Sequence, residues 1–207
     1  MKNCLIISGG EFNSLPSDFE YDYCIACDHG FDHAKKLGIK PDLLIGDFDS
    51  LESIKDDFKD VPVQSFDTRK DDTDTMLAIK HALSLGYKHI VLTCALGKRF
   101  DHTIANIQSM AYACYEGAEC ELFSDTEYMC TLSKCEKLFT FKKGYSFSLV
   151  SLTDECRGLS IKGSEYDCEN ITLTNKFPLG VSNKFKKETV SVSLKDGILL
   201  VVQSLMQ

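Results

Sequence analysis

The first half of the chain alternates short apolar runs with segments of helical periodicity, and this alternation constrains the fold more than any other feature. Short apolar runs predict buried strands, and apolar residues at intervals of three and four predict helices. The predicted strands are Cys4–Ser8, Tyr23–Cys27, Leu43–Ile45, Val63–Phe66, His89–Cys94 and Glu121–Phe123, and the predicted helices are His33–Leu37, Thr73–Leu85 and His102–Tyr115. Repeated strand–helix–strand units favour a parallel sheet with helices on both faces. We therefore expect an α/β domain over residues 1–126.

The second half has a different pattern, in which apolar and polar residues alternate one by one after about Ser124. Two pairs of alternating runs each surround a glycine turn, Leu138–Phe141 with Tyr145–Leu149 and Val190–Leu194 with Ile198–Val202. Such pairs predict β-hairpins. Residues 127–207 are therefore expected to form an all-β antiparallel sandwich.

Charge and cysteine content exclude some classes of protein. The formal net charge is −8, the isoelectric point is near 5.1, and lysine and arginine form no run, so we expect no nucleic-acid partner. The sequence has ten cysteines, and its first residues do not read as a secretory leader. We therefore expect reduced thiols and a cytoplasmic protein. Cys24 and Cys27 have a zinc-like spacing but fall within a predicted strand, so they are expected to be core thiols. No stretch approaches the ~20 apolar residues of a membrane span.

An acidic pair follows the third predicted strand, in Gly46-Asp47-Phe48-Asp49. In an extended segment alternate side chains point the same way, so both carboxylates face one side about 7 Å apart. Carboxylate oxygens are ligands that Mg²⁺ prefers. A capped turn is the alternative for an isolated pair.

A second acidic segment, Asp71-Asp72-Thr73-Asp74, opens a predicted helix. Asp72 or Thr73 suits the N-cap position, and capping alone could explain Asp72. Asp71 and Asp74 are additional carboxylates that helix capping does not explain. They are therefore candidate metal ligands.

A third segment, Gly97-Lys98-Arg99-Phe100-Asp101-His102, combines two cations, a carboxylate and an imidazole. Arg99 can make paired contacts with phosphate oxygens, Lys98 can act as a point charge and Asp101 can hold a metal ion. A loop salt bridge between Arg99 and Asp101 is the alternative, and His102 could simply begin a helix.

Glycine turns follow the first two predicted strands, in Ser8-Gly9-Gly10 and Asp28-His29-Gly30. Either turn could let a phosphate group approach the backbone, although each can also be a plain turn. The carboxyl ends of parallel strands gather at one edge of a sheet, and all the segments described above fall there. Together they favour metal-assisted transfer of a phosphorus-containing group.

These residues also resemble a known family, the bacterial thiamine pyrophosphokinases. The resemblance rests on Cys27–Gly30, Leu37–Ser50, Lys70–Asp74 and Gly97–His102, with thinner support from Tyr166, Gly180–Asn183 and Gly197–Val201. It implies a Rossmann-like nucleotide-binding catalytic domain, followed by a sandwich for thiamine binding and dimerisation. It also implies a homodimer that transfers pyrophosphate from ATP to the hydroxyl of thiamine with Mg²⁺, releasing AMP.

The candidate site combines the residue patterns with the roles that the resemblance implies. The candidate catalytic and magnesium-binding residues are Asp47, Asp49, Asp74 and Asp101, with Asp71 as a further metal ligand. The candidate nucleotide- and phosphate-binding residues are Ser8, Gly9, Asp28, Gly30, Lys98, Arg99 and His102. The residues that would hold thiamine, in a pocket shared between subunits, are Tyr166, Ser182 and Asn183.

The sequence departs from the family pattern at three positions. His29 and Lys98 stand where the family usually has glycine, so nucleotide contacts could differ, and the residues around Tyr166 match the family motif poorly. The chemistry itself agrees with the residues, because thiamine carries a cationic ring that an aromatic platform and an acidic rim would bind. Asp74 or Asp101 is the expected acceptor of the hydroxyl proton.

Two other functions remain open from the sequence. Leu44–Leu51 resembles the nucleophile strand of haloacid-dehalogenase-type phosphatases, in which Asp47 would be phosphorylated. That motif is normally N-terminal, whereas here it follows two predicted strands. The other alternative is a noncatalytic sensor of thiamine or nucleotide.

Overall fold

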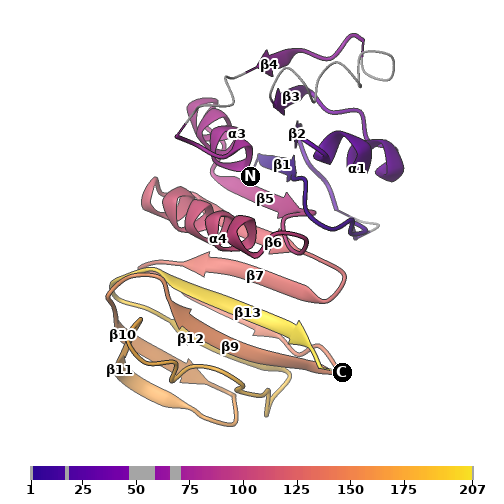
Figure 1. Ribbon diagram of the computed structural model, residues 1–207. Coiled ribbons are helices and arrows are strands. Elements are labelled where there is room, and N and C mark those ends of the chain that lie inside the picture. Colours follow the sequence, from indigo (N-terminus) through magenta and orange to yellow (C-terminus); the bar gives the residue numbers. More distant parts are fainter. Residues whose placement is uncertain (1, 17–18, 47–58, 66–70, 207) are drawn as a thin grey trace. The chain divides into compact units, whose positions relative to one another are not determined.

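The computed structural model describes residues 2–16, 19–46, 59–65 and 71–206 (Figure 1). The chain divides into two compact units, Met1–Asp125 and Thr126–Gln207. Each unit has its own cluster of buried apolar side chains.

The first unit is built on a parallel sheet. Its strands are β1 (Asn3–Ile7), β2 (Tyr23–Cys27), β3 (Leu43–Gly46), β4 (Val63–Ser65), β5 (His89–Thr93) and β6 (Glu119–Phe123). They lie in the order β4-β3-β2-β1-β5-β6, and each neighbouring pair is parallel. The chain runs outward from β1 to β4 and then returns to the other side of β1 with β5. The sheet order therefore reverses beside β1, and in parallel sheets ligands bind at the carboxyl ends of the strands next to such a reversal.

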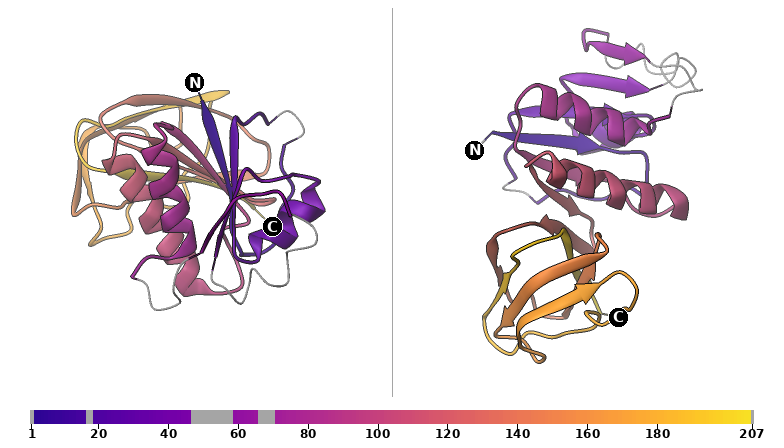
Figure 2. Two further views of the ribbon diagram at one scale, coloured as in Figure 1. Left: turned by 90° about the horizontal axis from the view of Figure 1, so that it is seen from above. Right: turned by 90° about the vertical axis from the view of Figure 1, so that its left-hand side faces the viewer.

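In the part of the chain that the structure describes, the helices that cover this sheet are α1 (Gly30–Leu37), α3 (Asp74–Ser84) and α4 (Phe100–Tyr115). Figure 2 shows α1 on one face of the strands and the pair α3 and α4 on the other. The central strands are accordingly buried on both faces and are apolar nearly throughout. The predicted α/β class, with helices on both faces, is confirmed.

Two helices begin earlier than their periodicity predicts. Helix α1 starts at Gly30 rather than His33, and α4 starts at Phe100 rather than His102. In neither helix does the N-cap residue, His29 or Arg99, make a side-chain capping hydrogen bond. The usual Ser, Thr, Asp or Asn signal is therefore missing at both starts. Thr73 does cap α3, as one of the two predicted candidates.

The second unit consists of antiparallel strands that form two groups. In the first, β13 (Leu199–Leu205) pairs with β7 (Glu127–Leu132) and with β9 (Tyr145–Ser151). In the second, the order is β11 (Cys168–Thr174), β10 (Glu155–Lys162), β12 (Thr189–Ser193) and β8 (Glu136–Thr140). Strands β7, β10 and β11 had no predicted counterpart; in β11, apolar and polar residues alternate only over the short run Ile171–Thr174.

Both predicted hairpins are wrong. Strand β8 pairs with β12 instead of β9, and β12 pairs with β8 and β10 instead of β13. The predicted turns exist, but each carries the chain from one sheet to the other. At Asp196-Gly197 the turn packs on β10, where a Cβ on Gly197 would lie 2.4 Å from the carbonyl oxygen of Glu155. The alternation of apolar and polar residues determines which side chains point inward, but it does not determine which strand is the pairing partner.

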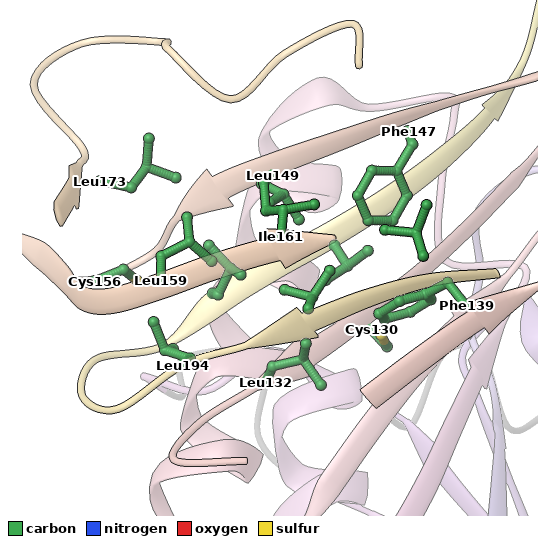
Figure 3. Packing of buried hydrophobic residues seen from close by; sticks show 14 residues of the cluster. Cys130, Leu132, Phe139, Phe147, Leu149, Cys156, Leu159, Ile161, Leu173 and Leu194 are labelled. Carbon is green, nitrogen blue, oxygen red and sulfur yellow. The ribbon is translucent and has the colours of Figure 1, made fainter. Parts of the chain in front are cut away.

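The two sheets of this unit share one apolar core, as the predicted sandwich requires (Figure 3). Phe139 from β8 and Phe147 from β9 meet across it, with ring centroids 5.6 Å apart. Leu159 and Ile161 from β10 and Leu149 from β9 extend the contact.

Across the described ranges, no helix combines the length and the apolar character needed to cross a lipid bilayer.

Candidate active site

A polar cavity of about 370 Å³ lies in the first unit, where the sheet order reverses beside β1. Loops after β1, β2 and β5 and the first turns of α3 and α4 form its walls. The predicted site residues that line it are Ser8, Gly9, Asp28, Asp74, Lys98, Arg99 and His102. Residues from four separate segments of the sequence therefore meet in one place.

The loop after β1 is held tightly against the loop after β5. The backbone N–H of Gly10 donates to the carbonyl oxygen of Cys94 at 2.7 Å, and that of Glu11 donates to Leu96 at 2.8 Å. A Cβ on Gly10 would lie 2.4 Å from the carbonyl oxygen of Leu96, so only glycine fits there. Ser8 is buried and its hydroxyl lies 2.9 Å from that of Thr75, which ties the loop to α3.

The loop after β2 brings a carboxylate to the cavity. Asp28 has a left-handed backbone with φ of 47°, and Gly30 follows where a Cβ would lie 2.1 Å from the carbonyl oxygen of Ile7. Gly30 does not line the cavity in the described chain; it lets the start of α1 approach β1. A Cβ on Gly46 would lie 3.3 Å from Oδ1 of Asp28, so this carboxylate lies beside the end of β3.

The first turn of α3 contributes a second carboxylate. Thr73 Oγ1 accepts a hydrogen bond from the backbone N–H of Met76 at 3.2 Å, which starts the helix and sets Asp74 in its first turn. Asp72 is directed elsewhere, since its oxygens lie 2.9 and 2.7 Å from Lys80 Nζ. Asp71 is exposed and is not among the described residues that line the cavity.

A buried thiol, Cys27, lies near Asp28 and Asp74 at the wall of the cavity. Burial raises the pKa of Cys27 well above its usual range, and the negative charges of Asp74 and Asp28 raise it further. The thiol is therefore protonated and donates to the backbone carbonyl of Asp74 at 3.6 Å. Two carboxylates acting on one thiol form an acidic wall of the cavity, suited to a divalent cation.

The loop after β5 supplies the cations. Lys98 has a left-handed φ of 53°, and its ammonium group donates to the carbonyl oxygen of Gly9 at 3.0 Å. Arg99 forms a paired contact with Asp101, with 3.1 Å from Nε to Oδ1 and 2.5 Å from Nη2 to Oδ2. The hydrogen bonds of this contact lower the pKa of Asp101 and raise the pKa of Arg99. Asp101 is exposed and, among the described residues, is not one that lines the cavity.

The predicted acidic pair Asp47 and Asp49 lies outside the described residues. Within the described ranges, the side chains close enough to share a metal ion are those of His89, Glu119 and Glu121, whose ligand atoms lie within 4.8 Å of one another. They occur near the amino ends of β5 and β6, at the sheet edge opposite the cavity. His89 Nε2 lies 3.6 Å from a carboxylate oxygen of Glu121.

A larger cavity of about 510 Å³ lies in the second unit. The three predicted thiamine residues, Tyr166, Ser182 and Asn183, line it together. Most of its other walls are apolar and come from β9, β10, β11 and the segment 179–181. Tyr166 is 66% exposed, which leaves its ring open to a ligand.

Asn183 is buried and its hydrogen bonds are directed to its own neighbourhood. Its side-chain oxygen accepts from the backbone N–H of Tyr166 at 3.1 Å, and its amide donates to Ser164 Oγ at 3.1 Å. Ser182 has a left-handed φ of 62° and its N–H donates to Ser148 Oγ at 3.1 Å. Asn183 therefore holds the Tyr166 and Ser182 segments together.

Several residues of these cavities had no role in the sequence prediction. In the polar cavity they include Cys27, Thr75 and Asn106, whose amide donates to the carbonyl oxygen of Ala95 at 2.7 Å. Asn106 lies one turn after His102 on α4, so helical spacing was a usable signal for it. The apolar residues of the second cavity, such as Leu179 and Val181, gave no such signal because they resemble ordinary surface or core residues.

Two family models match the chain. The model of the thiamin pyrophosphokinase catalytic domain matches residues 19–122, and that of the thiamin pyrophosphokinase vitamin B1 binding domain matches residues 131–199. A curated relative, the thiamine pyrophosphokinase of Bacillus subtilis (strain 168), is 26% identical over 224 residues, which cover 99% of each chain.

Solved structures agree in fold with this chain. The thiamine pyrophosphokinase structure from Bacillus subtilis has a TM-score of 0.88 and 24% identity, with 100% of both chains covered. The thiamin pyrophosphokinase structure from Geobacillus thermodenitrificans has a TM-score of 0.84 and 23% identity, covering 98% of this chain and 97% of that one. Since both halves of the chain match the two domain models in the same order, the chain belongs to the thiamin pyrophosphokinase family.

Proposed function

We propose that the chain transfers a diphosphate group from ATP to the hydroxyl of thiamine, with Mg²⁺, to give thiamine diphosphate and AMP. The observation that carries this proposal is the polar cavity, which combines a glycine loop, two carboxylates and two cations within the part matched by the catalytic-domain family. The members of this family make thiamine diphosphate, so the chain is a transferase rather than a phosphatase or a sensor.

The polyphosphate chain of ATP is proposed to lie against the loop after β1. Backbone N–H groups at strand ends and helix starts attract phosphate oxygens, and the first turns of α3 and α4 open into the cavity. Arg99 and Lys98 add positive charge at the same wall. Ser8, Gly9, Asp28, Gly30 and His102 complete the proposed nucleotide-binding set.

Carboxylates are proposed to hold the metal ion. The donor set fits Mg²⁺, because carboxylate oxygens are hard ligands and Asp28 and Asp74 face one cavity. Asp74, Asp47, Asp49, Asp71 and Asp101 are the proposed ligands. When bound, Mg²⁺ neutralises phosphate charge and helps to align the leaving group.

The chemical step needs a proton acceptor. The hydroxyl oxygen of thiamine forms a bond to the β-phosphorus of ATP, and the bond from that phosphorus to the oxygen bridging it to the α-phosphorus breaks. AMP leaves with that oxygen, and the hydroxyl proton passes to a carboxylate. Asp74 is the stronger candidate for this role, since it lines the cavity whereas Asp101 is paired with Arg99. Arg99 then stabilises the charge that develops on the phosphates.

Thiamine is proposed to bind at the cavity of the second unit. Its flat, cationic ring system suits the exposed ring of Tyr166 and the apolar walls around it. The match of this unit to the vitamin B1 binding domain supports the assignment. The proposal also includes a homodimer, which sedimentation velocity would test, and a cytoplasmic location.

The proposal is tested by incubating the purified chain with thiamine, ATP and Mg²⁺ and separating the products by chromatography. We expect AMP and thiamine diphosphate in equal amounts, with neither formed when thiamine is left out or Mg²⁺ is chelated. Binding of both substrates without AMP would identify a sensor. Release of inorganic phosphate with a phosphorylated Asp47 would identify a phosphatase.

A further inference from the structure

A buried histidine lies behind the glycine loop of the polar cavity. His33 is on α1, is only 5% exposed and does not line the cavity in the described chain. Its Nε2 atom lies 2.8 Å from the carbonyl oxygen of Gly10. The ring of Phe12 packs against it, with centroids 5.7 Å apart.

The hydrogen bond fixes the tautomer of His33. A carbonyl oxygen can only accept, so Nε2 carries the hydrogen and donates it to Gly10. Nδ1 is buried and has no hydrogen-bond partner among the described residues. Burial lowers the pKa of His33, and the charges of Lys98 and Lys36 lower it further, against the raising effects of the Gly10 bond and of Asp32. The ring is therefore neutral at neutral pH, with its one donor committed to the loop.

Two consecutive carbonyl groups of the loop are occupied by side-chain donors. Lys98 holds the carbonyl of Gly9, and His33 holds that of Gly10. A carbonyl oxygen turned toward a phosphate would repel it, whereas backbone N–H groups and cations attract it. Because both carbonyl groups are held by these donors, the loop is fixed in one orientation relative to a bound anion.

We propose that His33 is a positioning residue that fixes the Gly9-Gly10 loop for the triphosphate of the nucleotide. This inference rests on the proposed function of the polar cavity. In this proposal α1 sets the orientation of the loop. It contributes no charged group to phosphate binding. Preorganisation of this kind lowers the cost of ordering the loop when the ligand binds.

The test compares substitutions that keep or remove the donor. In His33→Gln the amide nitrogen reaches a position similar to Nε2, whereas His33→Leu has no donor and His33→Asn is too short to reach Gly10. Ile79→Val, in the buried face of α3, serves as a control for a general loss of packing. The measurements are KM for ATP, KM for thiamine, the Kd of a non-hydrolysable ATP analogue by calorimetry, and Tm.

We expect His33→Leu and His33→Asn to raise the Kd of the ATP analogue and KM for ATP by about five- to tenfold, the loss of one hydrogen bond, with KM for thiamine unchanged. His33→Gln should stay within about twofold of the unsubstituted chain, and so should Ile79→Val. Should His33→Leu not fold, the contrast of His33→Asn with His33→Gln answers the same question.

Three outcomes would overturn the inference while the unsubstituted chain still makes thiamine diphosphate. They are nucleotide affinity unaffected by loss of the donor, no rescue by His33→Gln, and a rise in KM for ATP in Ile79→Val as large as in His33→Leu. If the unsubstituted chain makes no thiamine diphosphate but its affinity for the ATP analogue still follows the donor, the proposed function fails and the positioning role stands.

Discussion

The two cavities of this chain differ in the chemical character of the residues that line them. The cavity in the first unit is made of loops at strand ends, and charged groups from Asp28, Asp74, Lys98 and Arg99 open into it. The cavity in the second unit is larger, at about 510 Å³ against about 370 Å³, and is lined mainly by apolar side chains. Its buried amide, Asn183, is satisfied by neighbouring protein groups. The first cavity therefore presents charged groups, and the second presents mainly apolar surface.

The difference also concerns how each cavity is kept in shape. In the first, close backbone approach at Gly10 and Gly30 and hydrogen bonds between loops do this. In the second, the loop that carries Ser182 is attached to a packed apolar core. Substitutions should therefore affect nucleotide chemistry through charge and loop geometry, and thiamine binding through ring area.

The largest effect is expected from Asp74→Asn, which removes a charge from the polar cavity at nearly constant shape. Turnover should fall by about a thousandfold, because a carboxylate that holds metal or accepts the proton is lost. The rate of AMP formation measures this, and Tm shows whether the fold is kept. Asp72→Asn is the matched control, since Asp72 pairs with Lys80 and should keep activity within about threefold. Equal activity of the two variants would show that Asp74 has no part in the chemistry.

A smaller effect is expected at the apolar cavity from Tyr166→Ala. KM for thiamine should rise by about tenfold through loss of the aromatic platform, while KM for ATP stays unchanged. Tyr166→Phe keeps the ring and should bind thiamine within about twofold of the unsubstituted chain. Phe177→Ala removes another exposed ring of the same unit and should have little effect. A parallel change in both KM values would mean that the cavities do not divide the substrates as proposed.

The smallest effect concerns stability in acid and distinguishes the two units again. Among the described buried polar residues of the second unit none is titratable, whereas the first unit contains His33. Because the pKa of His33 is lowered in the folded chain, the unfolded chain binds the proton more tightly. The stability that neutral His33 contributes is therefore complete above about pH 6.5 and is lost as the pH falls below it.

His33→Gln removes this titration, so its Tm should fall less between pH 7.5 and pH 5.5 than that of the unsubstituted chain, by about 2 °C. Differential scanning calorimetry at the two pH values measures the difference. Identical pH dependence in the two chains would show that protonation of His33 is not coupled to unfolding.

The sequence could predict the first unit well because its signals are local. Apolar strands, a Thr73 cap and the glycine turns each act within a few residues, and parallel topology brings the strand ends to one edge. The segments that line the polar cavity could therefore be grouped without coordinates. Asp101 shows where this reasoning stops, since its pairing with Arg99 was an alternative that only coordinates could decide. The roles of the individual aspartates remain predictions.

The second unit was harder because its pairing is not local. Turn residues at Gly144 and Gly197 were identified as turns, yet each turn joins strands of different sheets. Strand β11 was not predicted, and its apolar and polar residues alternate only over the short run Ile171–Thr174. The predicted set of Tyr166, Ser182 and Asn183 does line one cavity, but the apolar walls that shape it come from distant strands with no motif of their own.

The contrast between Gly9 and Gly10 sets limits on how this enzyme could be evolved or redesigned. A methyl group on Gly9 would meet His29 at an ordinary contact distance of 3.4 Å, whereas one on Gly10 would lie 2.4 and 2.6 Å from two carbonyl oxygens. The space around Gly9 would therefore accommodate a methyl group, whereas a side chain at Gly10 would force the loops after β1 and β5 apart. Two adjacent glycines thus differ in the substitutions that the surrounding backbone permits during evolution.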